Sequence, residues 1–212
     1  MLKAVLFDLD GTLVDTGEFI LQSYDFALKQ QGFQGITKER VAELAGMPLH
    51  SCYNRIAPMG DVEKFVRDHR AFQEKNLRMV REYKKTERLL EKIKKNGVKI
   101  AIVTGRYRKS SEMLLEKIGL KKAINALVCG DDFNESKPAA MPFKKAAEKL
   151  GIKARECLVV GDGCADITGG KAAGCKTCRA MYGYGATEEC KEKADFEIKK
   201  IEEVLECIQQ KK

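Results

Sequence analysis

The chain has 212 residues, of which 44% are hydrophobic and 33% charged, a composition typical of folded globular proteins that excludes a mainly disordered chain. The sequence shows neither a signal-peptide pattern nor an apolar stretch long enough to span a bilayer, so we expect a cytoplasmic protein with no membrane partner. The formal charge of +8 is spread along helical segments in which Lys and Arg alternate with Glu, which argues against a nucleic-acid partner and favours a small anionic substrate.

The first predicted element is a short apolar strand at residues 5–7, followed directly by Asp8, Asp10 and Gly11. Such a strand buries its middle and exposes its end, so the two carboxylates should lie at the rim of a sheet, where ligands collect in open α/β folds. Two carboxylates this close repel each other, and neither has a cationic neighbour in the sequence. The pair therefore predicts a bound metal ion or a shared proton.

A helical pattern without a convincing strand follows the first strand. Helix start signals stand at Asp15, at Thr37 and at Asp61. Because this block lies between the first and second strands, it predicts an all-helical cap inserted into the fold. The predicted division is a core of residues 1–15 and 83–212 and a cap of residues 16–82.

The rest of the chain alternates helices with apolar strands. The predicted strands are 98–103, 126–129, 157–160, 176–180 and 196–198, and the predicted helices are 86–96, 108–118, 140–150, 164–173 and 201–210. This alternation predicts an α/β fold, a Rossmann-like parallel sheet flanked by helices and joined by right-handed crossovers.

Eight cysteines are scattered through the chain, several of them inside apolar runs. We interpret them as reduced, buried packing residues, including Cys164 at the start of a predicted helix. Cys175 and Cys178 form a Cys-x-x-Cys pair, but no second pair with zinc spacing accompanies it, so packing is favoured there over zinc or redox chemistry.

The polar residues that interrupt the α/β pattern come just after apolar strands or in the loops beyond them. They are Asp8, Asp10, Thr104, Gly105, Lys137, Asp162 and Asp166. Each alone is weak evidence, since turns and helix caps use the same residue types. In a parallel sheet, however, all strand carboxyl ends share one edge, so these groups can converge on one crevice.

Together these residues suit phosphoryl transfer. Asp8, Asp10 and Asp162 supply the hard oxygen ligands that Mg²⁺ requires, and Asp166 can hold a bound water or orient a neighbour. Lys137, with the hydroxyl and amide groups of Thr104 and Gly105, can donate to phosphate oxygens. No Walker loop is present for a nucleotide, so the nucleophile must be a side chain or a metal-bound water.

These residues, in this order, resemble the four motifs of the haloacid dehalogenase superfamily. The resemblance covers nearly the whole chain, because the helical block lies where that family carries its cap. Within the family, residues 171–174 and 183–185 resemble the phosphoglycolate phosphatase and pyrophosphatase-like branch. The resemblance implies a Mg²⁺-dependent phosphatase that hydrolyses a small, phosphoglycolate-like metabolite.

The resemblance also implies a role for each position. Asp8 would attack phosphorus to form an aspartyl-phosphate, and Asp10 would act as acid and base. Mg²⁺ would be held by the Asp8 carboxylate, the Asp10 backbone carbonyl and Asp162, with Asp166 beside them. Thr104 and Lys137 would bind the phosphoryl oxygens. The chain departs from the family pattern after Lys137 and at residues 163–164, which bears on rate and metal affinity more than on mechanism.

Three other functions stay open at this point. A sugar-phosphate mutase of the beta-phosphoglucomutase type would use the same nucleophile, but the cap loop at residues 45–49 lacks the Arg or Lys that such relatives use. An inorganic pyrophosphatase belongs to the same branch. A binding protein on an inactive scaffold is disfavoured, because the site residues are all present.

For the oligomeric state, we expect a monomer or a weak homodimer.

Substrate specificity should come from the cap. Met47, His50 and Tyr53 lie in or near the cap loop and are candidates for substrate contacts. The alternative is that Met47 and Tyr53 pack inside the cap and that His50 is a surface residue.

Overall fold

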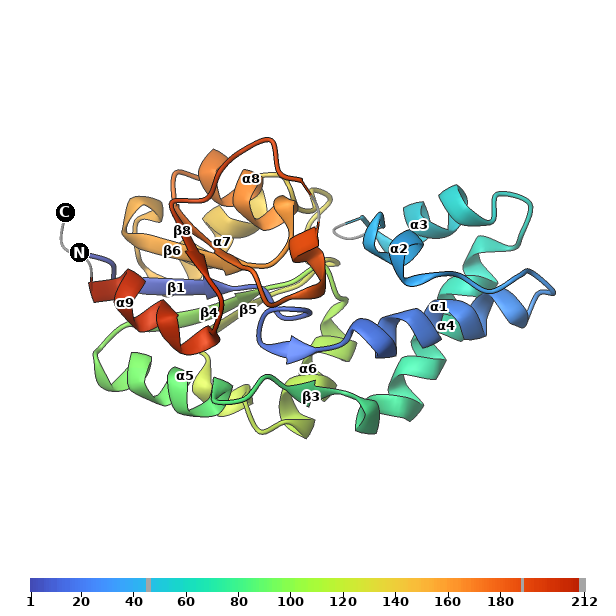
Figure 1. Ribbon diagram of the computed structural model, residues 1–212, viewed down its shortest axis with the longest axis horizontal. Coiled ribbons are helices and arrows are strands. Elements are labelled where there is room, and N and C mark those ends of the chain that lie inside the picture. Colours follow the sequence, from blue (N-terminus) through green and yellow to red (C-terminus); the bar gives the residue numbers. More distant parts are fainter. Residues whose placement is uncertain (45–46, 188, 210–212) are drawn as a thin grey trace.

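The computed structural model describes residues 1–44, 47–187 and 189–209. Within these residues, six parallel strands form the central sheet in the order β5-β4-β1-β6-β7-β8 (Figure 1). They are β1 (Ala4–Phe7), β4 (Lys99–Val103), β5 (Ala126–Val128), β6 (Cys157–Gly161), β7 (Lys176–Ala180) and β8 (Phe196–Ile198). All four residues of β1 are buried, which suits an apolar strand at the centre of a doubly wound sheet. The predicted α/β class is confirmed.

Helices cover both faces of the sheet. They are α5 (Thr86–Lys95), α6 (Arg108–Lys117) and α9 (Val204–Gln209) on one face, and α7 (Met141–Leu150) and α8 (Cys164–Ala172) on the other. Alternate residues of β1 divide between the two hydrophobic clusters, with Val5 and Phe7 in one and Ala4 and Leu6 in the other. This alternation is what a strand buried on both faces requires. The predicted terminal helix at 201–210 begins with a 3₁₀ turn, and Gln210 lies outside the described residues.

The helical insertion after the first strand is confirmed. It consists of α1 (Gly17–Lys29), α2 (Lys38–Ala42), α3 (Leu49–Ile56) and α4 (Val62–Asn76), which lie together beside the carboxyl edge of the sheet (Figure 1). The insertion has a hydrophobic cluster of its own, in which the Tyr53 ring stacks on Phe65 with centroids 4.8 Å apart. We call these four helices the cap. Its exact boundaries, residues 16–82, stay a prediction.

The predicted helix start at Asp15 is wrong. Helix α1 begins at Gly17, Thr16 precedes it without a capping hydrogen bond, and Asp15 belongs to a two-residue strand. This strand, β2 (Val14–Asp15), pairs antiparallel with β3 (Arg81–Glu82), so the two connections between cap and core are joined side by side. A two-residue strand has no readable period, which is why the sequence pattern missed it. The starts at Thr37 and Asp61 are confirmed, since each side chain caps its helix.

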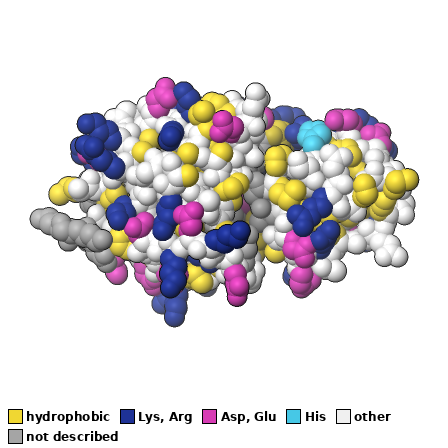
Figure 2. All heavy atoms as spheres, turned by 90° about the horizontal axis from the view of Figure 1, so that it is seen from above, with side chains coloured by type: hydrophobic (Ala, Val, Ile, Leu, Met, Phe, Trp, Pro, Cys, Tyr) yellow, Lys and Arg dark blue, Asp and Glu magenta, His cyan; other side chains and the backbone are white. Residues whose placement is uncertain are grey.

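Short 3₁₀ helices occur at chain turns. They are η1 (Leu77–Met79), η2 (Lys121–Ala123), η3 (Ala154–Glu156), η4 (Tyr184–Thr187) and η5 (Ile201–Glu203). None of the helices in the described ranges is long and apolar enough to cross a membrane. Figure 2 shows basic and acidic side chains interspersed over the face that it draws.

The cysteine prediction is wrong at two positions. Cys164, at the start of α8, forms a disulfide with Cys190 in the connection between β7 and β8, and their Cα atoms are 5.2 Å apart. The pairing depends on how this connection returns over α8, which sequence spacing does not reveal. The other six cysteines are free and buried, as predicted. Cys175 and Cys178 do not pair with each other. Cys175 interacts with Cys157, and Cys178 interacts with Cys207.

Candidate active site

A cavity of about 390 Å³ lies between the carboxyl ends of the central strands and the cap. The predicted site residues of the core all line it, namely Asp8, Asp10, Thr104, Gly105, Lys137, Asp162 and Asp166. They come from the ends of β1, β4 and β6, from the loop before α7 and from the first turn of α8, and the first and last of them lie more than a hundred residues apart in the chain. The convergence expected from a parallel sheet is therefore observed.

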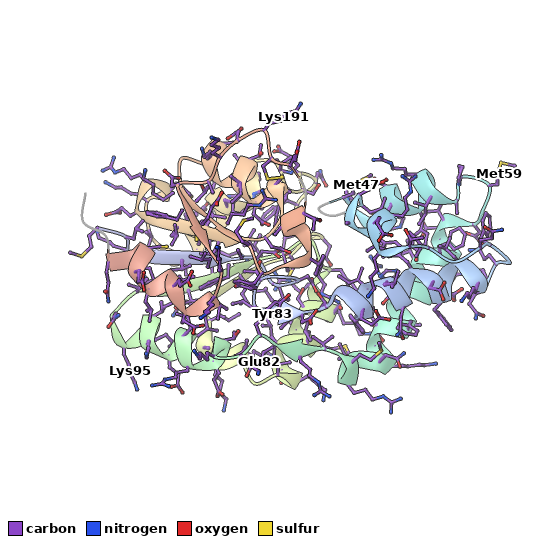
Figure 3. All side chains as sticks on the ribbon, viewed as in Figure 1. Met47, Met59, Glu82, Tyr83, Lys95 and Lys191 are labelled. Carbon is purple, nitrogen blue, oxygen red and sulfur yellow. A yellow bond between two sulfur atoms is a disulfide. The ribbon has the colours of Figure 1, made fainter. Side chains whose placement is uncertain are left out.

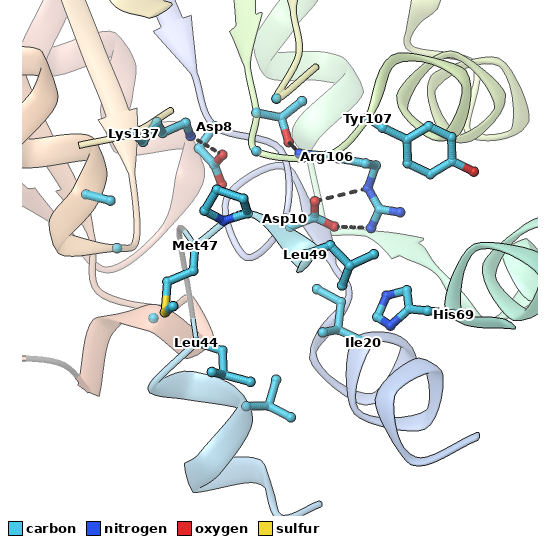
Figure 4. A pocket seen from close by; sticks show the side chains of 18 of the residues that line it. Asp8, Asp10, Ile20, Leu44, Met47, Leu49, His69, Arg106, Tyr107 and Lys137 are labelled. Atoms are coloured by element: carbon cyan, nitrogen blue, oxygen red, sulfur yellow. Dashed lines mark hydrogen bonds and ion pairs between the residues drawn. The ribbon is translucent and has the colours of Figure 1, made fainter. Parts of the chain in front are cut away.

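Lys137 connects two carboxylates at the floor of the cavity. Its Nζ lies 2.6 Å from Asp8 Oδ1 and 2.6 Å from Asp166 Oδ1, as Figure 4 shows for Asp8. All three side chains are at least nine-tenths buried. Because the interior screens charge poorly, this bridge holds Asp8 in a fixed orientation toward the cavity.

Asp162 is fixed by neutral groups instead of a cation. The Gly185 N–H donates to Oδ2 at 2.8 Å, and the Thr12 hydroxyl donates to Oδ1 at 3.3 Å. Gly11, with φ of +83°, lies so close that a Cβ there would stand 2.2 Å from Asp162 Oδ2. The turn after β1 thus needs glycine both for its left-handed backbone and for room beside Asp162.

Burial shifts the pKa values of these groups. Burial raises the pKa of Asp8 well above its ordinary range, although Lys137 acts in the opposite direction. Burial also raises the pKa of Asp162 to about 6, against the hydrogen bond from Gly185. Burial alone would lower the pKa of Lys137, but Asp166 and Asp8 outweigh it and the pKa lies above the usual value. Lys137 is therefore charged at neutral pH.

Asp8, Asp162 and Asp166 offer oxygen atoms that all lie within 4.8 Å of one another. The three carboxylates have one lysine among them, which bridges only Asp8 and Asp166, so the cluster has more acidic than basic groups and a divalent cation would offset the difference. Carboxylate oxygens are the ligands that hard cations such as Mg²⁺ prefer. The donor set therefore fits a divalent metal ion. The side chain of Asp10 is not part of this cluster.

Asp10 has a separate partner that the sequence analysis missed. Arg106 binds both of its oxygens through one edge of the guanidinium, with Nε donating to Oδ2 at 3.1 Å and Nη2 donating to Oδ1 at 2.6 Å (Figure 4). The Arg106 side chain is 5% exposed. The sequence does show an arginine directly after Thr104 and Gly105, which could have marked it as a site residue. Only the fold shows that the Arg106 side chain points toward Asp10.

Arg106 also connects Asp10 to the cap. Its Nη1 donates to Gln73 Oε1 at 2.7 Å, so the Gln73 amide nitrogen faces His69 and donates to Nε2 at 3.0 Å. The other ring nitrogen of His69 then carries the proton and donates to the Tyr53 hydroxyl at 2.9 Å. Burial, with smaller contributions from Arg106 and Arg70, lowers the pKa of His69 to about 3. This histidine is neutral at physiological pH.

Thr104 and Gly105, at the end of β4, line the same cavity. The Thr104 N–H donates to the Val128 carbonyl, and the hydroxyl oxygen accepts from Arg106 N at 3.1 Å. The hydroxyl hydrogen is left to donate into the cavity. Nothing lies within 4 Å of where a Gly105 side chain would begin, so a ligand oxygen can approach its backbone.

The cap residues proposed from the sequence divide into two groups. Met47 and His50 line the cavity, and Figures 3 and 4 show Met47 at the end of the cap that faces the core. The His50 side chain is 46% exposed and lies 3.2 Å from Glu63. Tyr53 does not line the cavity and is fully buried in the cap cluster, which fits the packing alternative. Two of the cap-loop residues, Ala45 and Gly46, lie outside the described residues.

Known proteins resemble this chain over nearly its full length. A family model described as haloacid dehalogenase-like hydrolase matches residues 5–180. Pyrophosphatase PpaX of Bacillus cereus (strain AH820) is 34% identical over 208 residues, which cover 96% of this chain and 95% of that protein. Phosphoglycolate phosphatase of Aquifex aeolicus (strain VF5) is 32% identical over 184 residues, which cover 86% of each.

A solved structure agrees closely with the fold. The crystal structure of a predicted phosphoglycolate phosphatase from Haemophilus somnus 129PT superimposes with a TM-score of 0.91 at 25% identity, covering 98% of both chains. The agreement extends over cap and core together.

Proposed function

This chain belongs to the haloacid dehalogenase-like hydrolase family, and we propose that it is a Mg²⁺-dependent phosphatase acting on a small phosphorylated metabolite. The observation that carries the proposal is the buried bridge from Lys137 to Asp8 and Asp166, with Asp162 beside it, at the floor of an open cavity. Mg²⁺ held by these three carboxylates would offset negative charge on the phosphoryl oxygens.

Asp8 is the proposed nucleophile. One carboxylate oxygen attacks phosphorus, the bond from phosphorus to the leaving oxygen breaks, and an aspartyl-phosphate forms that water then hydrolyses. Lys137 holds Asp8 in line and, with Thr104 and the Gly105 backbone, binds phosphoryl oxygens. The single high free-energy barrier of direct hydrolysis is thereby replaced by two lower barriers, one for each step.

Asp10 is the proposed acid and base. It gives a proton to the leaving oxygen in the first step and takes one from water in the second. Both its oxygens accept one hydrogen bond each from Arg106, so loosening this pair would free Asp10 to turn toward the leaving oxygen. Because Arg106 is tied to Gln73 in the cap, a shift of the cap would be the natural way to release it.

A phosphoglycolate-like substrate is the first candidate and pyrophosphate the second, because relatives with both names cover most of the chain. The cavity of about 390 Å³ suits a small metabolite. A mutase remains less favoured, since the described part of the cap loop, residues 47–49, carries no Arg or Lys.

The proposal is tested by phosphate release from p-nitrophenyl phosphate, 2-phosphoglycolate and pyrophosphate, with Mg²⁺ and with a chelator. We expect metal-dependent hydrolysis by the wild type and a loss of about a thousandfold or more in Asp8→Asn. Asp8→Asn is a fair comparison because Lys137 keeps its second partner, Asp166. Full activity in that variant, or in the chelator, would contradict the proposal; formation of an isomerised sugar phosphate would favour the mutase.

A further inference from the structure

Arg70, on helix α4 of the cap, lines the cavity with unused hydrogen-bond donors. Its Nε is buried and has no hydrogen-bond partner. No ion pair or hydrogen bond involves its guanidinium among the residues that the structure describes. The terminal nitrogens have no acceptor among the described residues either, and unlike Nε they are not buried, so they are the donors that a ligand in the cavity can reach.

The guanidinium is held in place without being neutralised. Its central carbon lies 4.5 Å from the centroid of the Tyr107 ring, a cation–π contact. The nearby carboxylate, Glu74, is already engaged, because it accepts from the Tyr107 hydroxyl at 3.0 Å and from Lys109 at 2.7 Å. Arg70 is therefore oriented by an aromatic ring while its charge stays available.

The other strong cations of the cavity are already paired with carboxylates. Lys137 bridges Asp8 and Asp166, and Arg106 binds both oxygens of Asp10. Figure 4 shows Tyr107, on which Arg70 stacks, on the far side of Arg106 from Asp8 and Lys137. Arg70 thus belongs to the end of the cavity that would receive the leaving group, not the phosphoryl group.

We propose that Arg70 binds a second anionic group of the substrate, a carboxylate or a phosphate, on the leaving-group side. This inference rests on the proposed phosphatase function and adds the residue that selects the substrate class. A planar guanidinium matches either group with two parallel hydrogen bonds.

The first experiment compares substrates that differ in the second anion. Phosphate release is measured from 2-phosphoglycolate, pyrophosphate and ethyl phosphate, which has a neutral leaving group, in wild type, Arg70→Gln and Arg67→Gln. Arg67 is the matched control, an exposed arginine on the same helix outside the cavity. In Arg70→Gln we expect kcat/KM for 2-phosphoglycolate, pyrophosphate or both, which carry a second anionic group, to fall about tenfold more than for ethyl phosphate, mainly through KM. Arg67→Gln should keep the wild-type ratios.

The outcomes separate the possibilities. A selective loss with 2-phosphoglycolate identifies a carboxylate as the second anion, and a selective loss with pyrophosphate identifies a phosphate. An equal fall for all substrates, or unchanged ratios, would overturn the proposal, because a merely structural role would not distinguish the leaving groups.

A second measurement does not depend on turnover. Calorimetry compares phosphonoacetate, a non-hydrolysable diacid, with ethylphosphonate in the presence of Mg²⁺. We expect the wild type to bind phosphonoacetate more tightly and Arg70→Gln to lose about tenfold of that preference. The same preference in both proteins would overturn the role of Arg70. A protein that hydrolyses no phosphomonoester but prefers phosphonoacetate only when Arg70 is present would contradict the phosphatase function. The same result would support Arg70 as the site that binds the second anion.

Discussion

Asp8 and Asp10 are two residues apart in the chain, yet each meets a different cation. Asp8 is bound by Lys137 and Asp10 by Arg106, over sequence separations of 129 and 96 residues. The repulsion expected between neighbouring carboxylates is therefore relieved by two cations that sequence proximity could not reveal. This difference in surroundings gives the two residues different chemical possibilities.

Asp162 should make the protein's stability respond to a metal ion. A ligand that binds only the folded state stabilises it by about 3 kcal/mol at a hundred times its Kd, which corresponds to a Tm increase of about 5–10 °C for a chain of this size. We expect Mg²⁺ to raise the Tm of the wild type and of Glu63→Gln, an exposed control. Asp162→Asn should lose most of this increase. Thermal unfolding with and without Mg²⁺ measures it, and an equal increase in Asp162→Asn would refute the assigned ligand set.

At the scale of elements, the turn after β1 should be intolerant of any side chain at Gly11. A Cβ there would meet Asp162 Oδ2 at 2.2 Å, and φ is +83°. Gly97 is the matched control, since its φ of +73° costs a similar strain but nothing lies within 4 Å. We expect Gly97→Ala to lose about 1 kcal/mol of stability and keep its activity, whereas Gly11→Ala loses activity by more than about tenfold. Equal activities in the two variants would show that the close approach is unimportant.

Helix α4 carries a histidine that should make the cap sensitive to acid. The pKa of His69 is lowered to about 3, below the unfolded value near 6.5, so the unfolded state binds more protons between these values. Stability from neutral His69 is complete above about pH 6.5 and is lost as the pH falls. Between pH 7.5 and pH 5 this loss is about 2 kcal/mol.

Denaturant unfolding at the two pH values measures this effect. In His69→Gln the decrease in unfolding free energy from pH 7.5 to pH 5 should be about 2 kcal/mol smaller than in the wild type. His50→Gln removes the chain's other histidine, whose side chain is 46% exposed, and should keep the wild-type decrease. A wild-type decrease in His69→Gln would show that protonation of His69 does not cause the loss of stability in acid.

At the scale of the whole molecule, one covalent link ties the β7–β8 connection to α8. The disulfide between Cys164 and Cys190 closes a separation of 26 residues, which is worth about 3 kcal/mol through the entropy of the unfolded chain. We expect Cys164→Ser with Cys190→Ser to lose about this much stability. A thiol reductant should destabilise the wild type similarly and leave the double variant unchanged. Eight reactive thiols in the unreduced, denatured wild type, instead of six, would contradict the pairing.

The sequence was sufficient for the sheet and for the core residues of the cavity, because parallel strands bring their carboxyl ends to one edge wherever they lie in the chain. Asp8 and Asp162, which directly follow β1 and β6, could be placed by that rule alone. It was not sufficient for contacts that depend on side-chain direction or loop path. Arg106 could turn toward solvent or toward Asp10, and the route of the chain to Cys190 has no local signal.

The central claim is that the chain hydrolyses phosphate esters through an aspartyl-phosphate on Asp8. Its most direct test is acid quenching of the Mg²⁺-loaded protein during turnover of p-nitrophenyl phosphate, followed by peptide mass spectrometry. We expect one phosphoryl group on the peptide that contains Asp8. It should accumulate in Asp10→Asn, which lacks the base for its breakdown, and be absent in Asp8→Asn. A phosphoryl group on another peptide, or rapid hydrolysis by Asp8→Asn, would contradict the account.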